Sequence, residues 1–252
     1  MPVSSAHQDP ARSVVFAPLD ITGRAELVAQ RLTDAIVGGM LRDGERLPSE
    51  SELSRSFGVA LVTAREALET MRGQGLVQTR RGRDGGSFVT YDRDTAARLL
   101  DARLRDHSRI QVRDLALHLQ AITGTAAAIA ADRASADDID SLQRIHEASD
   151  LSTPGGARRA MGRFHLELAA VSQSPRLVRE EVRLQGEAGP LLWLCLRDQE
   201  YRDRSAHERD LVLAALRTSA PESARAAVAE FIHTARDWLI DEKQRVEASD
   251  PA

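Results

Sequence analysis

The sequence predicts a mainly α-helical protein in which a small α+β head precedes an all-helical bundle. Three helical stretches and two short β-prone runs occupy residues 27–90, whereas no segment from Asp94 onward has the pattern of a strand. With 252 residues, 42% of them hydrophobic, the chain is long enough for two domains with separate cores. We therefore expect a flexible tail at 1–18, a head at 19–91 and a helical domain at 94–246.

Three helices are expected in the head. Apolar residues recur at helical spacing from Leu27 until the stretch stops at the glycine pair 38–39. Ser49, followed three residues later by Glu52, forms the capping box of a second helix that ends at Gly58. The third helix is predicted over 60–72, where small and apolar residues share one face.

Two β-prone runs, 76–79 and 87–90, follow these helices and are joined by RRGRDGG, which predicts a hairpin. Three helices followed by a two-stranded wing are the layout of a winged helix-turn-helix. In that fold the third helix enters the DNA major groove.

The second half of the chain predicts a bundle of six or seven helices. The run PLLWLCL, residues 190–196, is apolar on all sides and indicates a central buried helix. The expected helices cover about 94–106, 110–132, 136–149, 157–173, 175–200, 204–218 and 222–245.

Charge and composition limit the function classes. The net charge is -4, yet four arginines and no acidic residue lie between residues 71 and 83, so a polyanion would meet a local basic patch. The single cysteine, Cys195, excludes an internal disulfide framework. No apolar run is long enough for a membrane span. We expect a cytoplasmic protein that has no membrane partner.

The candidate DNA-binding residues lie on the predicted wing and third helix. Glycines at the wing tip permit close approach to a phosphate backbone or a minor groove, and arginines supply the charge. Thr63 and Arg65 lie on the early turns of the third helix, although Arg65 could instead pair with Glu69 four residues later, and a charged loop can simply be solvated. The complete candidate set is Ser49, Thr63, Arg65, Arg80, Arg81, Gly82, Arg83, Gly85 and Gly86.

The stretch ERLPSESELSRSFGVALVTAREALETMRGQGLVQTRRGRDGGSFV resembles the DNA-binding head of the GntR family of bacterial transcription regulators. The helical remainder is similar in length and order to the FadR-type (FCD) effector domain of that family, through stretches such as RFHLELAAVSQSPRL and AAVAEFI. The resemblance implies a homodimeric regulator, most often a repressor, that binds a short inverted repeat and senses a small metabolite. Ala60-Leu61 and Ser51 replace residues with which the family usually contacts DNA, so we expect a changed operator.

The resemblance also implies a possible divalent metal (Zn, Ni or Mn) held by one Asp and three His. At the matching positions this chain has Met161, His165, Arg209 and Phe231, and only the histidine is a good ligand. We therefore expect no cofactor. A register shift of two residues would leave one alternative, a three-histidine site formed by His165, His207 and His233.

The candidate effector residues are His165, Arg209 and Met161, together with Leu119 and Thr123 where the family usually has Arg and Glu. This set predicts a fairly apolar pocket for an organic acid or a less polar effector. Two alternatives remain. The bundle could serve only dimerisation, or the histidines could form a metal-dependent enzyme, although no Ser/His/Asp spacing, nucleotide loop or carboxylate pair supports catalysis.

Overall fold

The structure is a computed structural model, and it describes residues 25–37, 40–82, 85–90, 102 and 104–248. The predicted tail at 1–18, the boundary near 91–94, Arg83 and most of the helix expected at 94–106 lie outside these residues. The described part is mainly α-helical with one small antiparallel sheet, which confirms the predicted fold class.

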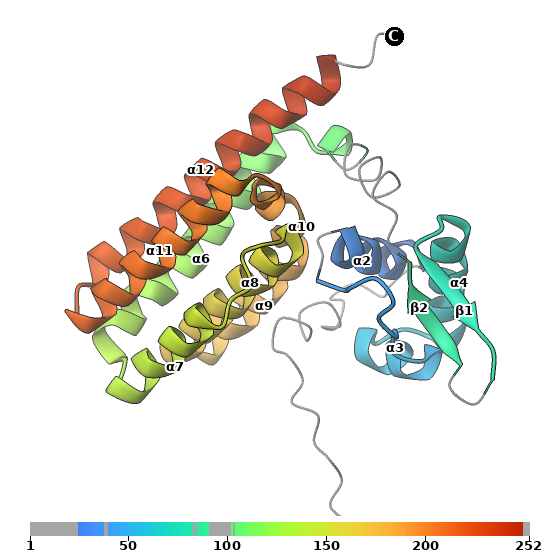
Figure 1. Cartoon of the computed structure of the whole chain (residues 1–252), viewed down its shortest axis with the longest axis horizontal. Helices are drawn as coiled ribbons and strands as arrows, with labels where there is room; N and C mark the ends of the chain where they lie inside the picture. Colours follow the sequence, from blue (N-terminus) through green and yellow to red (C-terminus); the bar gives the residue numbers. More distant parts are fainter. Residues whose placement is uncertain (1–24, 38–39, 83–84, 91–101, 103, 249–252) are drawn as a thin grey trace, which may run out of the picture.

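The described residues of the head form three helices and a hairpin (Figure 1), and these elements are α2 (Ala25–Val37), α3 (Glu50–Phe57), α4 (Leu61–Gly73), β1 (Val77–Arg80) and β2 (Gly86–Val89). Helix α4 packs on α2 and α3, and their apolar faces enclose a core that includes Leu32, Phe57 and Met71. Most of the apolar residues on the predicted faces are therefore buried, but Leu27 of α2 and Leu61 of α4 are exposed, so these two expectations are wrong.

Helix α3 begins and ends as its sequence predicts. The Ser49 side chain accepts a hydrogen bond from the Glu52 amide at 3.3 Å, and the Ser49 amide donates to Glu52 Oε2 at 2.8 Å. These reciprocal bonds satisfy two amides that have no partner inside the helix. The bonds from Ser49 also hold the pKa of the Glu52 carboxyl below its usual value. Gly58 ends the helix in the left-handed conformation, at φ +66°.

The wing is anchored to the loop that precedes α3. Val77 pairs with Val89 and Arg80 with Gly86 in the antiparallel register, and Arg46 forms an isolated bridge with Phe88. Gly86 has φ +152°, and a Cβ there would come within 2.9 Å of Arg46 Nε. A glycine at this position therefore lets the strand lie against the arginine.

The second half consists of helices packed around one large apolar core, separate from the core of the head. The long helices α6 and α12 lie side by side (Figure 1). The elements are α6 (Arg109–Arg133), α7 (Ala136–Glu147), α8 (Pro154–Val171), α9 (Pro175–Glu187), α10 (Gly189–Leu192), the 3-10 helix η1 (Trp193–Arg197), α11 (Gln199–Arg217) and α12 (Pro221–Ala248). Within the described residues, no helix is long and apolar enough to cross a membrane.

The single helix predicted over 175–200 is wrong, because the chain breaks after α9 and continues as α10 and η1. Pro190 lacks an amide hydrogen and its ring clashes with the preceding turn, so α9 cannot run through it. Gly189 lies where a Cβ would come within 3.2 Å of Gln185 Oε1 and 3.3 Å of Trp193 Nε1. The residues 190–196 are nevertheless central, and the apolar side chains among them are buried.

Two predicted helix starts are also wrong. Helix α8 begins at Pro154 rather than at 157, because Thr153 caps it by accepting from the Gly156 amide at 3.0 Å and proline suits a first helical turn. Helix α11 begins at Gln199 rather than at 204, with Asp198 preceding it in the extended conformation.

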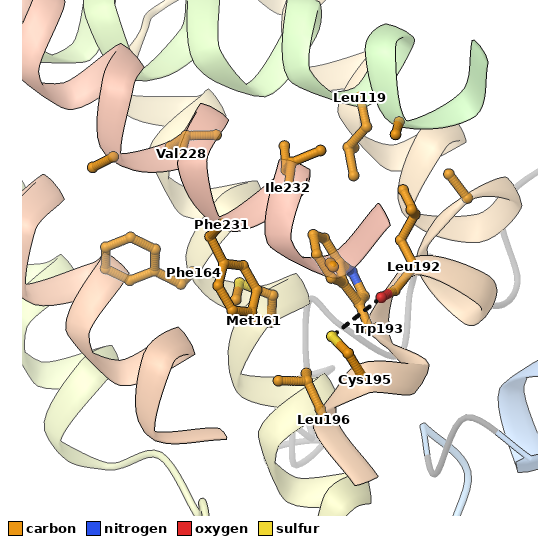
Figure 2. Close-up of a cluster of buried hydrophobic side chains, with 14 of the residues drawn as sticks. Leu119, Met161, Phe164, Leu192, Trp193, Cys195, Leu196, Val228, Phe231 and Ile232 are labelled. Carbon is orange, nitrogen blue, oxygen red and sulfur yellow. Dashed lines mark hydrogen bonds between the residues drawn. The ribbon is translucent and has the colours of Figure 1, made fainter. Parts of the chain in front are cut away.

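Figure 2 shows the centre of the bundle, where Met161, Phe164, Trp193 and Phe231 lie among aliphatic side chains. The Trp193 and Phe231 rings stack at a centroid distance of 5.9 Å. Cys195 Sγ donates to the Leu192 carbonyl at 3.4 Å, and burial raises the pKa of this thiol to about 12. Cys195 is therefore an unreactive apolar residue of the core.

Candidate DNA-binding and effector sites

The recognition helix α4 presents Arg65 to solvent, whereas Thr63 is half-buried. Arg65 Nε donates to Glu50 Oε2 of α3 at 3.0 Å, so the alternative in which Arg65 pairs with Glu69 is wrong. The helix-turn-helix geometry brings Glu50 closer than the residue one turn away. Both partners are partly exposed, and such a pair contributes little to stability. Arg65 can therefore exchange Glu50 for a DNA group at small cost.

The wing arginines have different surroundings. The Arg80 guanidinium lies over the Phe88 ring, 4.4 Å from its centroid, which fixes the side chain along the hairpin. Arg81 is exposed beside Gly82, which has φ +110°. A Cβ at Gly85 would come within 2.6 Å of the Arg80 carbonyl oxygen, so the tip requires a glycine there. The wing therefore holds one arginine by stacking and presents another to solvent.

Ser49, the remaining candidate in the head, caps α3. Its hydroxyl donates to Glu52 Oε2 at 2.7 Å and lies 3.2 Å from the Ser51 hydroxyl. The residue thus has a structural role in positioning the helix that precedes α4. Its contact with DNA stays a prediction.

A chain of buried polar side chains crosses the bundle. Thr123 Oγ1 on α6 donates to Glu181 Oε2 on α9 at 2.7 Å, and Gln185 Nε2 donates to Glu181 Oε1 at 2.7 Å. Gln185 Nε2 also lies 3.5 Å from His165 Nδ1 on α8, whose Nε2 lies 3.2 Å from Glu208 Oε1 on α11. All five side chains are buried, so these bonds couple four helices in a low-dielectric interior.

These hydrogen-bonded polar side chains correct the expectation of an apolar lining around Leu119 and Thr123. Both residues are buried, but the Thr123 hydroxyl bonds a carboxyl group that the sequence analysis did not predict there. Desolvation raises the pKa of Glu181, which favours its neutral form. Glu181 and Gln185 lie four residues apart on the face that buries Leu184, and this spacing is the signal that could have revealed them.

Arg209 is the most unusual side chain of the bundle because it is fully buried. Its Nε donates to His146 Nδ1 on α7 at 3.2 Å, and His146 Nε2 lies 3.0 Å from Asp210 Oδ1. Among the residues that the structure describes, neither Nη1 nor Nη2 has a hydrogen-bond partner. Burial lowers the pKa of Arg209, but arginine keeps its proton in proteins. The core therefore contains a positive charge with two unused donor groups.

The residues that the family resemblance places around a metal do not fit one. Met161, His165, Arg209 and Phe231 are all buried, but a thioether, a guanidinium and a phenyl ring cannot replace carboxylate and imidazole ligands. In the described ranges, no group of three or more His, Cys, Asp or Glu side chains is arranged for metal binding.

The three-histidine alternative is wrong. His165 is buried against Glu208, whereas His207 and His233 are exposed, and His233 Nε2 lies 2.8 Å from Gln120 Oε1. The two exposed histidines are two positions away from the inward-facing Arg209 and Phe231, which places them on nearly the opposite helix face.

A winged helix-turn-helix joined to a helical bundle with a buried polar centre defines a class of protein, the DNA-binding regulator with a sensing domain. Residues 24–89 match the family model for bacterial regulatory proteins of the gntR family, and residues 114–234 match the model of the FCD domain. The chain belongs to the GntR family.

Relatives along most of the chain support this assignment. The HTH-type transcriptional regulator RmpR of Mycobacterium gastri is 37% identical over 237 residues, which cover 93% of this chain and 86% of that protein. The Uxu operon regulator of Haemophilus influenzae is 24% identical over 221 residues, which cover 85% and 81%. The structure of McbR/YncC of Escherichia coli matches 88% of this chain and 99% of its own, with a TM-score of 0.51 and 19% identity.

These matches identify the function class. The chain is a DNA-binding transcription regulator with an effector-sensing FCD domain, and its domains and relatives are those of regulators rather than enzymes.

Proposed function

We propose that this regulator is a cytoplasmic homodimeric repressor that binds a short inverted repeat and is released by a small organic anion. DNA reading is assigned to residues 19–91, and dimerisation and sensing to 94–246. The observation that carries the proposal is the buried Arg209 guanidinium, whose two terminal nitrogens have no partner among the described residues.

The DNA-binding step uses the exposed groups of the head. Arg65 on α4, together with Thr63, is assigned to base edges or nearby phosphates of the major groove. Ser49 and the wing residues Arg80–Gly82, Arg83, Gly85 and Gly86 are assigned to the sugar–phosphate backbone. One head makes few base contacts, so two heads on one dimer double the site and match an inverted repeat.

The sensing step uses Arg209. Burial of a charge whose terminal donors are unpaired costs several kcal/mol, and an anion that accepts from both Nη atoms would reduce this cost. A carboxylate is the group whose two oxygens match the planar fork of a guanidinium. Arg209 would thus bind the acid group directly, without the metal that relatives are expected to use. Leu119 and Met161 belong to the buried apolar cluster of the bundle, and His165 and Thr123 are polar groups of the same interior.

The proposal is tested in two stages. Purified protein first captures genomic fragments, and a recovered operator is then titrated in a fluorescence anisotropy assay with a panel of small carboxylic acids. We expect one or more acids to release the wild type, whereas Arg209→Met binds the same operator and is not released.

Two outcomes would contradict the proposal. Release of Arg209→Met by the same acid at the same concentration would remove Arg209 from the sensor. A monomeric mass by light scattering at micromolar concentration, with full affinity for a single half-site, would exclude the dimer.

A further inference from the structure

A pocket lies between α11 and α12, and Arg209 is not among its lining residues. It has a volume of about 210 Å³ and is partly open to solvent. Leu211, Ala227 and Phe231 form its apolar part, and the other lining residues are Arg204, His207, Glu208, Glu230 and Thr234. Its size is below the ~300–1,000 Å³ of pockets for drug-sized ligands, which indicates a ligand of few atoms.

Glu208 gives this pocket a chemical preference. Only 3% of the residue is exposed, and its Oε1 lies 3.2 Å from His165 Nε2. Its other oxygen, Oε2, is buried and has no hydrogen-bond partner within the described part of the chain. A buried acceptor without a donor is unfavourable, and a ligand that donates a hydrogen bond from the pocket would satisfy it.

The charges around the pocket favour a cationic donor. Glu230 is exposed at the pocket and adds a second carboxylate. Arg204, the lining residue of opposite charge, has its Nη2 2.6 Å from Glu200 Oε1, and Glu200 lies outside the lining. The Arg209 charge opposes a cation, and it interacts electrostatically with the neighbouring Glu208, but Arg209 does not line the pocket and its Nε bonds His146 on α7.

We propose that the α11–α12 pocket binds a small organic ammonium ion, whose N–H group donates to Glu208 Oε2 and whose carbon chain contacts Leu211, Ala227 and Phe231. Charge-assisted hydrogen bonds are stronger than those from neutral donors, so an ammonium group is preferred to a hydroxyl of the same shape. A bare metal ion would leave the apolar wall unused. The pocket is a site separate from the anion site proposed at Arg209.

Calorimetric titration of the protein tests this with three four-carbon probes of different charge, of which the first two share the same four-methylene chain. These are putrescine (two ammonium groups), 1,4-butanediol (neutral) and succinate (anionic). We expect saturable putrescine binding with a Kd below about 10 mM and at least tenfold weaker binding of the diol. Binding of the diol as tight as that of putrescine, or no saturable putrescine signal, would overturn the proposal.

Variants locate the binding. Glu208→Gln should weaken putrescine binding about tenfold or more, and the exposed Glu230→Gln, which does not disturb the core, about threefold. The matched control is Glu222→Gln, an exposed carboxylate in the first turn of α12 that lies outside the pocket and has the same effect on net charge. The affinity of Glu222→Gln for putrescine should equal that of the wild type. Equal weakening in Glu230→Gln and Glu222→Gln would show only a long-range charge effect and would overturn the site.

Succinate separates this inference from the proposed function. Succinate binding should survive Glu230→Gln and be lost in Arg209→Met, whereas putrescine binding should survive Arg209→Met and weaken about threefold in Glu230→Gln. Loss of putrescine binding in Arg209→Met with retention in Glu230→Gln would contradict the separate site.

Discussion

Replacement of Arg209 by methionine should stabilise the ligand-free protein. The substitution removes a fully buried charge whose terminal nitrogens lack partners among the described residues, and it keeps an unbranched apolar stem. Replacement of buried ion pairs by apolar residues has often been neutral or has stabilised proteins by about 1–4 kcal/mol, and the Arg209 terminal nitrogens have no paired group to leave behind. The change also loses the 3.2 Å bond from Arg209 Nε to His146, which contributes about 1 kcal/mol. The free energy of unfolding should therefore rise by about 0–3 kcal/mol.

The helical half supplies its own spectroscopic probe. Both tryptophans of the chain, Trp193 and Trp238, belong to the bundle, so urea unfolding followed by tryptophan fluorescence reports on this half alone. The denaturation midpoint of Arg209→Met should move to higher urea with an unchanged slope.

Arg202 on the same helix provides the contrasting control. It is also buried, but its Nη1 donates to the Leu196 and Arg197 carbonyls at 3.0 and 2.8 Å. Arg202→Met leaves these carbonyls without that donor and should cost about 1–3 kcal/mol. A loss of stability in Arg209→Met as large as that in Arg202→Met would refute the reasoning, because it would show that the Arg209 charge is satisfied in the ligand-free protein.

Three further predictions concern single groups. Arg65→Ala should weaken binding to the recovered operator by about 1–3 kcal/mol in anisotropy titrations at fixed salt, and unchanged affinity would remove it from base reading. Ser49→Ala should destabilise α3 by about 0.5–2 kcal/mol, seen as faster hydrogen exchange of its amides, with Ser51→Ala as the control. Glu181 has a pKa raised above its ordinary 4.5 by desolvation, so the folded state binds more protons and wild-type stability should fall as pH rises above that value. Glu181→Gln should abolish this decline in urea titrations between pH 5 and pH 8, and an equally steep decline would contradict the assignment.

The elements of the head could be predicted because each has a local cause. The capping box at Ser49, the left-handed Gly58 and the change from helical to alternating pattern depend on residues close together in the chain. The partner of Arg65 could not be predicted in this way. Glu50 is 15 residues distant in sequence, and only the crossing of α3 and α4 brings it within 3.0 Å.

In the bundle too, local features could be predicted from the sequence, whereas contacts between residues distant in sequence could not. The apolar run at 190–196 correctly indicated burial, but periodicity alone could not distinguish a continuous helix from the break that Pro190 imposes. The buried hydrogen bonds that lead from Thr123 to Glu208 join residues on four helices, and no local pattern specifies which polar groups meet. The resemblance did identify Arg209 as a non-ligand, and the structure added that its terminal nitrogens are buried without partners.

Trp193 occupies the break between α10 and α11 and contacts three other helices from a single position. Its indole N–H donates to Gln185 on α9, its carbonyl accepts from Arg158 on α8, and its ring stacks on Phe231 of α12. Helices that contact one residue in this way cannot open independently, so α8, α9 and α12 should exchange their amide hydrogens as a single cooperative unit. The helix break therefore places Trp193 where it links these helices into one cooperative unit.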